Sequence, residues 1–220
     1  MIQFQDVTKR FKQGFKEISV LNNFNFIIEE SGTIAIVGKS GCGKSTFLSL
    51  LAGLDSPTTG KIFIDKQEIT HKSERELTVF RAKNIGFIFQ NFNLIESFTV
   101  LENVMLPLEV LNVSSPKEKA THYLNSVGLQ DRHNHFPDQL SGGEKQRVAI
   151  ARACVTNPQI ILADEPSGNL DPETGNEVMS VLFRTAKEFQ QTVILVTHDY
   201  ELAKKCDHIF EIKNHQIVKL

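Results

Sequence analysis

Residues 38–45 of this chain have the sequence Gly38-Lys39-Ser40-Gly41-Cys42-Gly43-Lys44-Ser45, which matches the pattern GxxxxGK[ST] at every fixed position. A nearly continuous apolar run, Thr33 to Val37, precedes it and predicts a strand buried on both faces. From Lys44 onward the spacing of apolar residues predicts a helix, with Gly53 placed to end it. The apolar residues of this predicted helix are Phe47, Leu50, Leu51 and Leu54. A strand, a glycine-rich loop and a helix in this order are the setting in which such a loop binds phosphate groups.

The residue types of the loop fit this chemistry. Glycines let the backbone turn tightly and approach phosphate oxygens closely. Successive N–H groups then point inward at the positive end of the following helix. We expect Lys44 to reach the β- and γ-phosphates of a nucleotide and Ser45 to bind Mg²⁺. The alternative is a glycine-rich turn that binds nothing, and the strand, the lysine and the serine together argue against it.

Two carboxylates follow a second apolar run, Ile160–Ala163. Asp164 at the end of this predicted strand can hold Mg²⁺ directly or through water, and Glu165 is then placed to polarise an attacking water. Taken alone, two acids after a strand are usually a solvated strand end. In a chain that also carries a phosphate loop, the functional interpretation is the stronger one.

A second glycine-containing motif is Leu140-Ser141-Gly142-Gly143-Glu144-Lys145-Gln146-Arg147. Ser141 and Glu144 form the S-x-x-E capping box that starts a helix. A well-capped helix accounts for the box, but it requires no pair of glycines in its first turn, where they lower helix stability. The exposed amides of Gly142 and Gly143 therefore predict a second anion site.

The rest of the pattern is typical of an α/β protein with a partly parallel sheet. Alternation over residues 24–28 predicts an antiparallel strand near the start, Glu30-Ser31-Gly32 predicts a turn, and the end of the chain predicts a hairpin turned at Asn214-His215. Helical spacing prevails from about 91 to 157. A later helix is predicted to begin at Asp171-Pro172, with the aspartate as cap.

Composition limits the classes of protein to consider. A length of 220 residues fits one large domain, and a net charge of -2 gives no electrostatic reason to expect a nucleic-acid partner. The 3 cysteines are scattered, which favours a reducing compartment over a disulfide framework. The first residues have no apolar segment of the signal-peptide type, and no run approaches the ~20 apolar residues of a membrane helix. A function at a membrane would therefore need a partner that spans it.

With these motifs in place, the chain resembles the nucleotide-binding subunits of ABC transporters over essentially its whole length. The segment 140–147 is similar to the signature motif of that family, which is far more specific than a phosphate loop. Gln90 matches the family's glutamine loop, Ser167–Asp171 its D-loop, and His198 the switch histidine that contacts the γ-phosphate. Phe11 stands where the family carries an aromatic residue, more often tyrosine, that stacks on adenine. The alternative for Phe11 is a core residue of an edge strand.

The resemblance implies a P-loop NTPase fold of the ABC ATPase type: an α/β protein with a mixed sheet core, an antiparallel β subdomain and an inserted helical subdomain. In this interpretation residues 1–220 form a single ABC ATPase domain. A RecA-like core with the β subdomain takes up about 1–90 and 158–220, and the helical subdomain about 91–157.

The resemblance also implies an ATPase coupled to transport, with ATP and Mg²⁺ as cofactors. Two copies would pack head to tail on binding ATP, each ATP lying between the phosphate loop of one copy and the signature motif of the other. ATP closes this homodimer, hydrolysis reopens it, and an integral membrane subunit converts the motion into transport. The chain would lie as a peripheral subunit at the cytoplasmic face of the inner (cell) membrane.

The site residues that the resemblance implies fall into three groups. They are Lys44, Gln90, Glu165 and His198 for catalysis; Phe11, Gly38, Lys39, Ser40, Gly41, Cys42, Gly43, Lys44, Ser45, Thr46, Ser141, Gly142 and Gly143 for ATP binding; and Ser45, Gln90 and Asp164 for Mg²⁺.

Within the family the chain is most similar to the ATPase subunits of lipoprotein-releasing and macrolide-export systems. The similarity lies in residues 76–81, 85–94, 99–108, 163–171 and 196–199, and Glu201–Lys204 resembles the lipoprotein-releasing subunit in particular. Lipoprotein release from the inner membrane is therefore expected. The alternatives are a macrolide-type exporter, a cell-division complex or an amino-acid importer, because the segment Phe92–Phe98 is close to a form that several of these subfamilies share.

Two other interpretations concern the membrane partner and the class of protein. The apolar segment Leu94–Leu111 can form subdomain core or a groove that receives a short helix of the membrane subunit. ABC ATPases that act on ribosomes or DNA tend to have tandem nucleotide domains or a long coiled-coil insertion, and this chain has one domain and no sustained heptads. The signature motif and His198 argue against a phosphate-loop kinase or GTPase.

Overall fold

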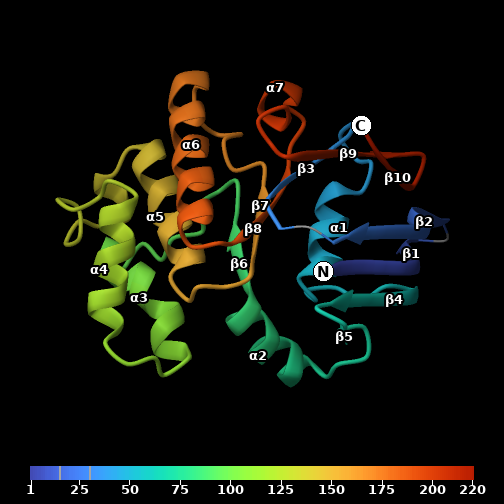
Figure 1. Ribbon diagram of the computed structural model, residues 1–220, viewed down its shortest axis with the longest axis horizontal. Helices are drawn as coiled ribbons and strands as arrows, with labels where there is room; N and C mark the ends of the chain where they lie inside the picture. The colour runs from blue at the N-terminus through green and yellow to red at the C-terminus, as the bar shows by residue number, and fades with distance from the viewer. Residues whose placement is uncertain (15, 30) are drawn as a thin grey trace. The chain divides into compact units, whose positions relative to one another are not determined.

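The computed structural model describes residues 1–14, 16–29 and 31–220 (Figure 1). Glu30, in the predicted turn at 30–32, lies outside the described residues. The chain forms two compact units, one of Met1–Arg81 with Ile194–Leu220 and the other of Ala82–Val193.

The elements of the first unit are β1 (Ile2–Gln13), β2 (Lys16–Ile28), β3 (Thr33–Val37), α1 (Lys44–Leu51), β4 (Thr59–Ile64), β5 (Gln67–Glu68), α7 (Tyr200–Ala203), β9 (His208–Lys213) and β10 (Gln216–Lys219). Those of the second unit are β6 (Ile85–Ile88), α3 (Val100–Val110), α4 (Pro116–Ser126), the 3₁₀ turn η1 (Pro137–Gln139), α5 (Gly142–Cys154), β7 (Ile160–Asp164) and α6 (Pro172–Glu188). Two elements continue across the boundaries between the units: α2 (Glu74–Asn84) and β8 (Thr192–Val196).

The first unit contains an antiparallel sheet with the strand order β2-β1-β4-β5, as the alternating pattern predicts (Figure 1). Its inner face is aromatic. Phe4 pairs across the strands with Phe26, and the ring of Phe4 stacks on Phe47 of α1 with the centroids 5.0 Å apart. Aromatic pairs of this kind add about 0.5–1.5 kcal/mol beyond their area burial. The helix that follows the phosphate loop is thus packed directly on this sheet.

A second set of strands in the same unit has the order β10-β9-β3-β8. β3 pairs in parallel with β9, and β9 pairs antiparallel with β10, so the predicted mixed sheet is confirmed. The predicted hairpin turn is also confirmed, since Asn214 and His215 have φ of 51° and 65°. β3 is buried along most of its length, which fixes the point from which the phosphate loop leaves the sheet.

One sequence prediction about α1 is wrong. Leu54 was expected on the apolar face of the helix, but α1 ends at Leu51 and Leu54 is 55% exposed. Gly53 has φ of 61°, which turns the chain out of the helix. The N–H of Leu54 then bonds back to the carbonyl of Ser49 at 2.9 Å.

In the second unit β6 pairs in parallel with β7, and α5 packs against α3, α4 and α6. Residues 91–157 are all described and contain helices and turns but no strand. The predicted start of α6 is confirmed, with Pro172 as first residue and Asp171 as its cap. No helix among the described residues of either unit combines the length and apolar character needed to cross a membrane.

Candidate functional site

The phosphate-loop motif links the buried strand β3 to α1, as predicted. Gly43 is the N-cap of α1 and has φ of 108°, a backbone conformation that side chains rarely adopt. A Cβ on Gly43 would also lie 2.8 Å from Cγ1 of Val20, so a larger residue would clash with this side chain of β2. This position therefore requires glycine for both conformation and space.

Lys44 is almost fully buried at 6% exposure. Its Nζ donates hydrogen bonds to the carbonyl oxygens of Gly38 at 2.8 Å and Lys39 at 3.2 Å. The ammonium is therefore held inside the curve of the loop by neutral acceptors. A buried cation with neutral partners is well suited to an anionic ligand, which would supply the missing countercharge.

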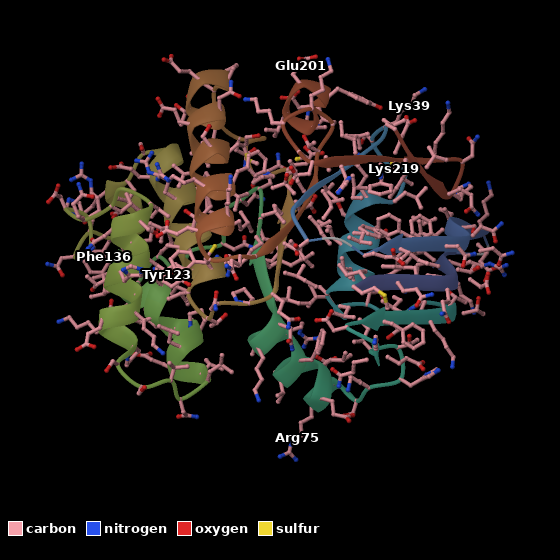
Figure 2. The ribbon with its side chains drawn as sticks, viewed as in Figure 1. Lys39, Arg75, Tyr123, Phe136, Glu201 and Lys219 are labelled. Atoms are coloured by element: carbon pink, nitrogen blue, oxygen red, sulfur yellow. The ribbon has the colours of Figure 1, made fainter. Side chains whose placement is uncertain are left out.

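The other residues of the loop differ in exposure. Lys39, labelled in Figure 2, is exposed together with Ser40, Gly41 and Ser45, while Cys42 and Thr46 are half-buried. The side chain of Ser45 lies in the first turn of α1.

Phe11 lies near the end of β1, opposite Ile18 of β2. The alternative that it is a core residue is wrong, because Phe11 is 41% exposed. The ammonium of Lys9 lies 4.8 Å from the centroid of its ring. The structure thus presents Phe11 as an accessible aromatic surface backed by a cation.

His198 follows β8 and is exposed. Its neighbours fix the backbone on both sides. The N–H of Thr197 bonds to the carbonyl of Ile36 in β3 at 3.2 Å, and Asp199 caps α7 by accepting from the N–H of Glu201 at 2.9 Å. The backbone from which the imidazole projects is therefore set by the sheet and by the start of α7.

Asp164 ends β7, and Glu165 follows it with φ of 44°. Positive φ is uncommon for a residue with a side chain, and such backbone strain tends to persist at functional sites. The carbonyl of Glu165 accepts a hydrogen bond from the N–H of Gly168 at 2.9 Å, which closes a tight turn. No residue pattern around Glu165 predicted this conformation.

Gln90 is held by the D-loop residue Asn169. Its Nε2 donates to Oδ1 of Asn169 at 3.1 Å, while Nδ2 of Asn169 donates to the carbonyl of Gln90 at 3.0 Å and to Oδ1 of Asn91 at 2.8 Å. Sequence reasoning placed Gln90 and the D-loop separately. The structure joins them.

The segment after Gln90 is held by a second side chain, Arg152 of α5. Its two terminal nitrogens donate to the carbonyls of Phe92 at 2.8 Å and Asn93 at 2.6 Å. Phe92 and Asn93 both have positive φ, at 59° and 50°. The planar fork of arginine is suited to two such acceptors at once.

The predicted capping box at the start of α5 is confirmed. Oγ of Ser141 accepts from the N–H of Glu144 at 3.2 Å, and the Glu144 carboxylate accepts from the N–H of Ser141 at 2.8 Å. Glu144 also pairs with Nε of Arg132 at 2.8 Å. This hydrogen bond from Arg132, with those from Ser141, lowers the pKa of Glu144 from 4.5 to about 2. The carboxylate is therefore ionised at neutral pH and reinforces the helix start.

The two glycines of this motif are not equivalent. Gly142 is exposed, so its amide can face a ligand. Gly143 is buried, and a Cβ there would lie 2.6 Å from Cγ2 of Thr174 in α6. Packing against α6 therefore accounts for Gly143, whereas the exposed glycine predicted from the sequence is found at Gly142.

The donors expected to bind Mg²⁺ suit that ion chemically. Mg²⁺ prefers hard oxygen ligands. These residues offer the hydroxyl of Ser45, the carboxylate of Asp164 and the amide oxygen of Gln90. Among the described residues no group of three or more His, Cys, Asp or Glu could hold a metal. A Mg²⁺ ion at this motif set would therefore need hydroxyl, amide, water or phosphate oxygens as well.

Comparison with known proteins agrees with the motifs described above. The family model described as ABC transporter matches residues 21–168. The chain is 46% identical to the uncharacterized ABC transporter ATP-binding protein MJ1508 of Methanocaldococcus jannaschii, covering 100% of this chain and 99% of the relative. It is 45% identical to the lipoprotein-releasing system ATP-binding protein LolD of Wigglesworthia glossinidia brevipalpis, covering 100% and 96%.

The fold has a solved counterpart. The dimeric structure of MJ0796, a bacterial ABC transporter cassette, matches with a TM-score of 0.90 at 42% identity, covering 100% of this chain and 99% of that one. The same cassette has been solved as a dimer in a post-hydrolysis state with ADP and Pi. On motifs, fold and full-length identity together, this chain belongs to the ABC transporter family as one of its ATP-hydrolysing, ATP-binding subunits.

Proposed function

We propose that this ATPase subunit drives the release of lipoproteins from the inner membrane. The observation that carries the proposal is the 45% identity, over the whole chain, to an ATP-binding protein named for a lipoprotein-releasing system. The family places ATP hydrolysis in this chain, and Glu201–Lys204 supports the finer assignment by its resemblance to the lipoprotein-releasing subunit.

For the nucleotide we propose the following division of roles. Phe11 stacks on adenine, and the amides of residues 38–46 bind the phosphates. Lys44 exchanges its carbonyl acceptors for β- and γ-phosphate oxygens. Asp164 and Ser45 would hold Mg²⁺, which when bound neutralises phosphate charge.

For hydrolysis we propose that Glu165 orients and polarises the attacking water. Gln90 positions the same water and contributes an amide oxygen toward Mg²⁺, and His198 contacts the γ-phosphate. The left-handed backbone at Glu165 supports its role, since backbone strain of this kind tends to persist at functional sites.

We propose that the working form is an ATP-dependent homodimer at the cytoplasmic face of the membrane. Ser141, Gly142 and Gly143 would act on the ATP held by the partner copy. The exposed amide of Gly142 at the start of α5 supports this role. The dimeric assemblies of the MJ0796 cassette support the two-copy form.

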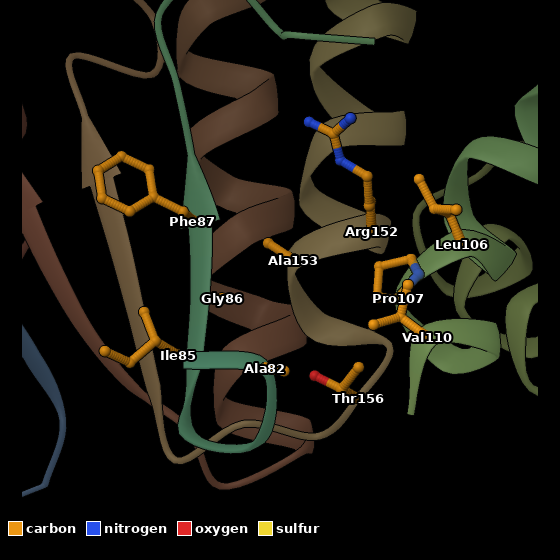
Figure 3. A pocket seen from close by; sticks show the side chains of 10 residues that line it. All are labelled: Ala82, Ile85, Gly86, Phe87, Leu106, Pro107, Val110, Arg152, Ala153 and Thr156. Carbon is orange, nitrogen blue, oxygen red and sulfur yellow. The ribbon is translucent and has the colours of Figure 1, made fainter. Parts of the chain in front are cut away.

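We further propose that residues 91–157 act as a helical subdomain that receives the membrane partner. In the second unit a cavity of about 280 Å³ lies between β6, α3 and α5 (Figure 3). Its lining is mainly apolar and includes Leu106, Pro107 and Val110, the last 64% exposed. A short amphipathic helix of an integral membrane subunit is the occupant that such a groove suits.

The first test uses Glu165→Gln, with Glu177→Gln on the exposed side of α6 as a matched control. With ATP, the Glu165 variant should form a stable dimer by light scattering and lose hydrolysis, whereas the control should behave as wild type. A Glu165→Gln form that hydrolyses ATP normally and stays monomeric would remove the catalytic assignment.

The second test addresses transport. The tagged Glu165→Gln protein is trapped with ATP, purified from gently solubilised membranes, and its partners are identified. Lipoprotein release is supported by a membrane subunit with few spans and a large extracytoplasmic domain, and by ATP-dependent release of lipoprotein from membranes carrying the wild-type complex. A compact permease with many spans contradicts it.

A further inference from the structure

A buried lysine lies directly against Phe11 in the first unit. Lys9 is only 9% exposed, and its Nζ lies 4.8 Å from the centroid of the Phe11 ring. Cations within about 6 Å of an aromatic face are attracted by the negative face of the ring. One face of Phe11 is therefore occupied by a charge, while 41% of the residue stays exposed.

The ammonium of Lys9 is itself fixed by two oxygen acceptors. It forms an ion pair with Oδ1 of Asp55 at 2.6 Å and donates a hydrogen bond to the carbonyl of Ser56 at 2.8 Å. A lysine ammonium has three donors, and two of them are committed here. The Lys9 ammonium is thus held at a fixed position against the Phe11 ring.

Asp55 and Ser56 belong to the loop that leaves the C-terminus of α1. Two hydrogen bonds reinforce this connection to β1: the N–H of Thr58 donates to the carbonyl of Thr8 at 2.8 Å, and the N–H of Arg10 donates to the side-chain Oγ1 of Thr58 at 3.0 Å. α1 has 8 residues and is about 12 Å long, and it begins at Lys44 of the phosphate loop. The ring of Phe11 is therefore tied to the far end of the helix that the phosphate loop starts.

We propose that Lys9 is a positioning residue which, anchored by Asp55, holds the Phe11 ring ready to accept a purine base on the face opposite the ammonium. This inference rests on the proposed base-stacking role of Phe11. An exposed aromatic side chain without such support would sample several rotamers and lose that freedom when a nucleotide binds. Ordering the ring in advance reduces this loss and strengthens binding.

The test compares ATP with inorganic triphosphate, which has the phosphates but no base. Dissociation constants are measured by calorimetry for the wild type, Lys9→Met and the control Lys12→Met, whose lysine is exposed on the same strand. Lys9→Met should weaken ATP binding about two- to fivefold, the range expected when one side chain must be ordered on binding, and leave triphosphate binding unchanged. Asp55→Asn should give a smaller loss in the same direction, and Lys12→Met no loss.

A double-mutant cycle with Phe11→Ala completes the experiment. In the Phe11→Ala background, Lys9→Met should cause no further loss of ATP affinity. The inference is overturned if Lys9→Met weakens ATP and triphosphate equally, if its effect persists without the ring, or if folded Lys9→Met binds ATP as the wild type does. Unchanged ATP affinity in Phe11→Ala itself would instead remove base stacking, and with it the proposed role of Phe11.

Discussion

Replacing Asn169 by alanine is expected to slow ATP hydrolysis through Gln90, a residue 79 positions away in the chain. In the structure Oδ1 of Asn169 accepts from Nε2 of Gln90, and its Nδ2 donates to the Gln90 carbonyl and to Asn91. The two donor bonds fix the orientation of the Asn169 amide. Because Nε2 of Gln90 donates to Asn169, its Oε1 lies on the other side of the amide, as the role proposed for it toward Mg²⁺ requires.

The size of the effect follows from these contacts. One hydrogen bond contributes about 0.5–1.5 kcal/mol to the free energy of unfolding. The bonds of Asn169 are exposed, so in the variant water can form hydrogen bonds with the freed groups, and the loss of stability should be small. The orientation of the Gln90 amide has no such replacement. Losing about 1 kcal/mol of preference for the productive orientation lowers kcat about fivefold. The KM for ATP should change little.

The assay is steady-state ATP hydrolysis over a range of ATP and Mg²⁺ concentrations, with thermal unfolding measured alongside. Asn91→Ala is the matched control, because it removes one of the three contacts and leaves the bond from Gln90 to Asn169 intact. The reasoning is refuted if Asn169→Ala and Asn91→Ala have the same kcat, or if Asn169→Ala lowers only the unfolding temperature.

Three further predictions concern single residues. Alkylation should occur first at Cys42, because burial raises the pKa of Cys154 to about 12 and that of Cys206 to about 11. Labelling should block ATP hydrolysis and bound ATP should protect; mass spectrometry with activity assays checks this, and full activity after complete Cys42 labelling would contradict it. Because the pKa of Glu144 is lowered from 4.5 to about 2, its contribution to stability should be complete above about pH 4.5 and be lost as the pH falls toward 2. In urea unfolding, the free energy of unfolding should fall less steeply with acid in Glu144→Gln than in the wild type, and identical pH profiles would rule this contribution out. Gly143→Ala should destabilise the fold by about 1–3 kcal/mol, since the new methyl group meets α6 at 2.6 Å; an unchanged urea midpoint would show that α6 yields freely.

The elements that could be predicted from the sequence are those with a strong local signal. β3 and the start of α1 follow from an apolar run and a glycine pattern, and the capping box of α5 follows from two residues three positions apart. α2 was missed. Only Leu77 and Phe80 of its residues are buried, and Val79 is 50% exposed, so the helix carries almost no amphipathic pattern.

The contacts that hold the site residues could not be predicted for a different reason. Lys9 and Asp55 are 46 positions apart, and Gln90 and Asn169 are 79 apart. Gln90 and Asn169 lie in two family motifs and Lys9 and Asp55 in none, but in no case do the neighbouring residues identify the hydrogen-bond partner. Such contacts depend on how strands and loops meet in space, which hydrophobic periodicity does not encode. The candidate residues themselves were found through short motifs, and their assigned roles remain predictions.

The two hydrogen bonds from Arg152 have a mechanical consequence. They clamp the backbone at Phe92 and Asn93 to a point near the C-terminus of α5, while Gly142 and Gly143 form the N-terminus of the same helix. The two ends are about 15 Å apart along a hydrogen-bonded rod that resists bending. We therefore expect a force on residues 92–93 to reach the two glycines as a tilt of the whole helix, transmitted through Arg152. Lysine at position 152 would keep the charge but bridge the two carbonyls poorly, so residues 92–93 would be held less firmly to α5.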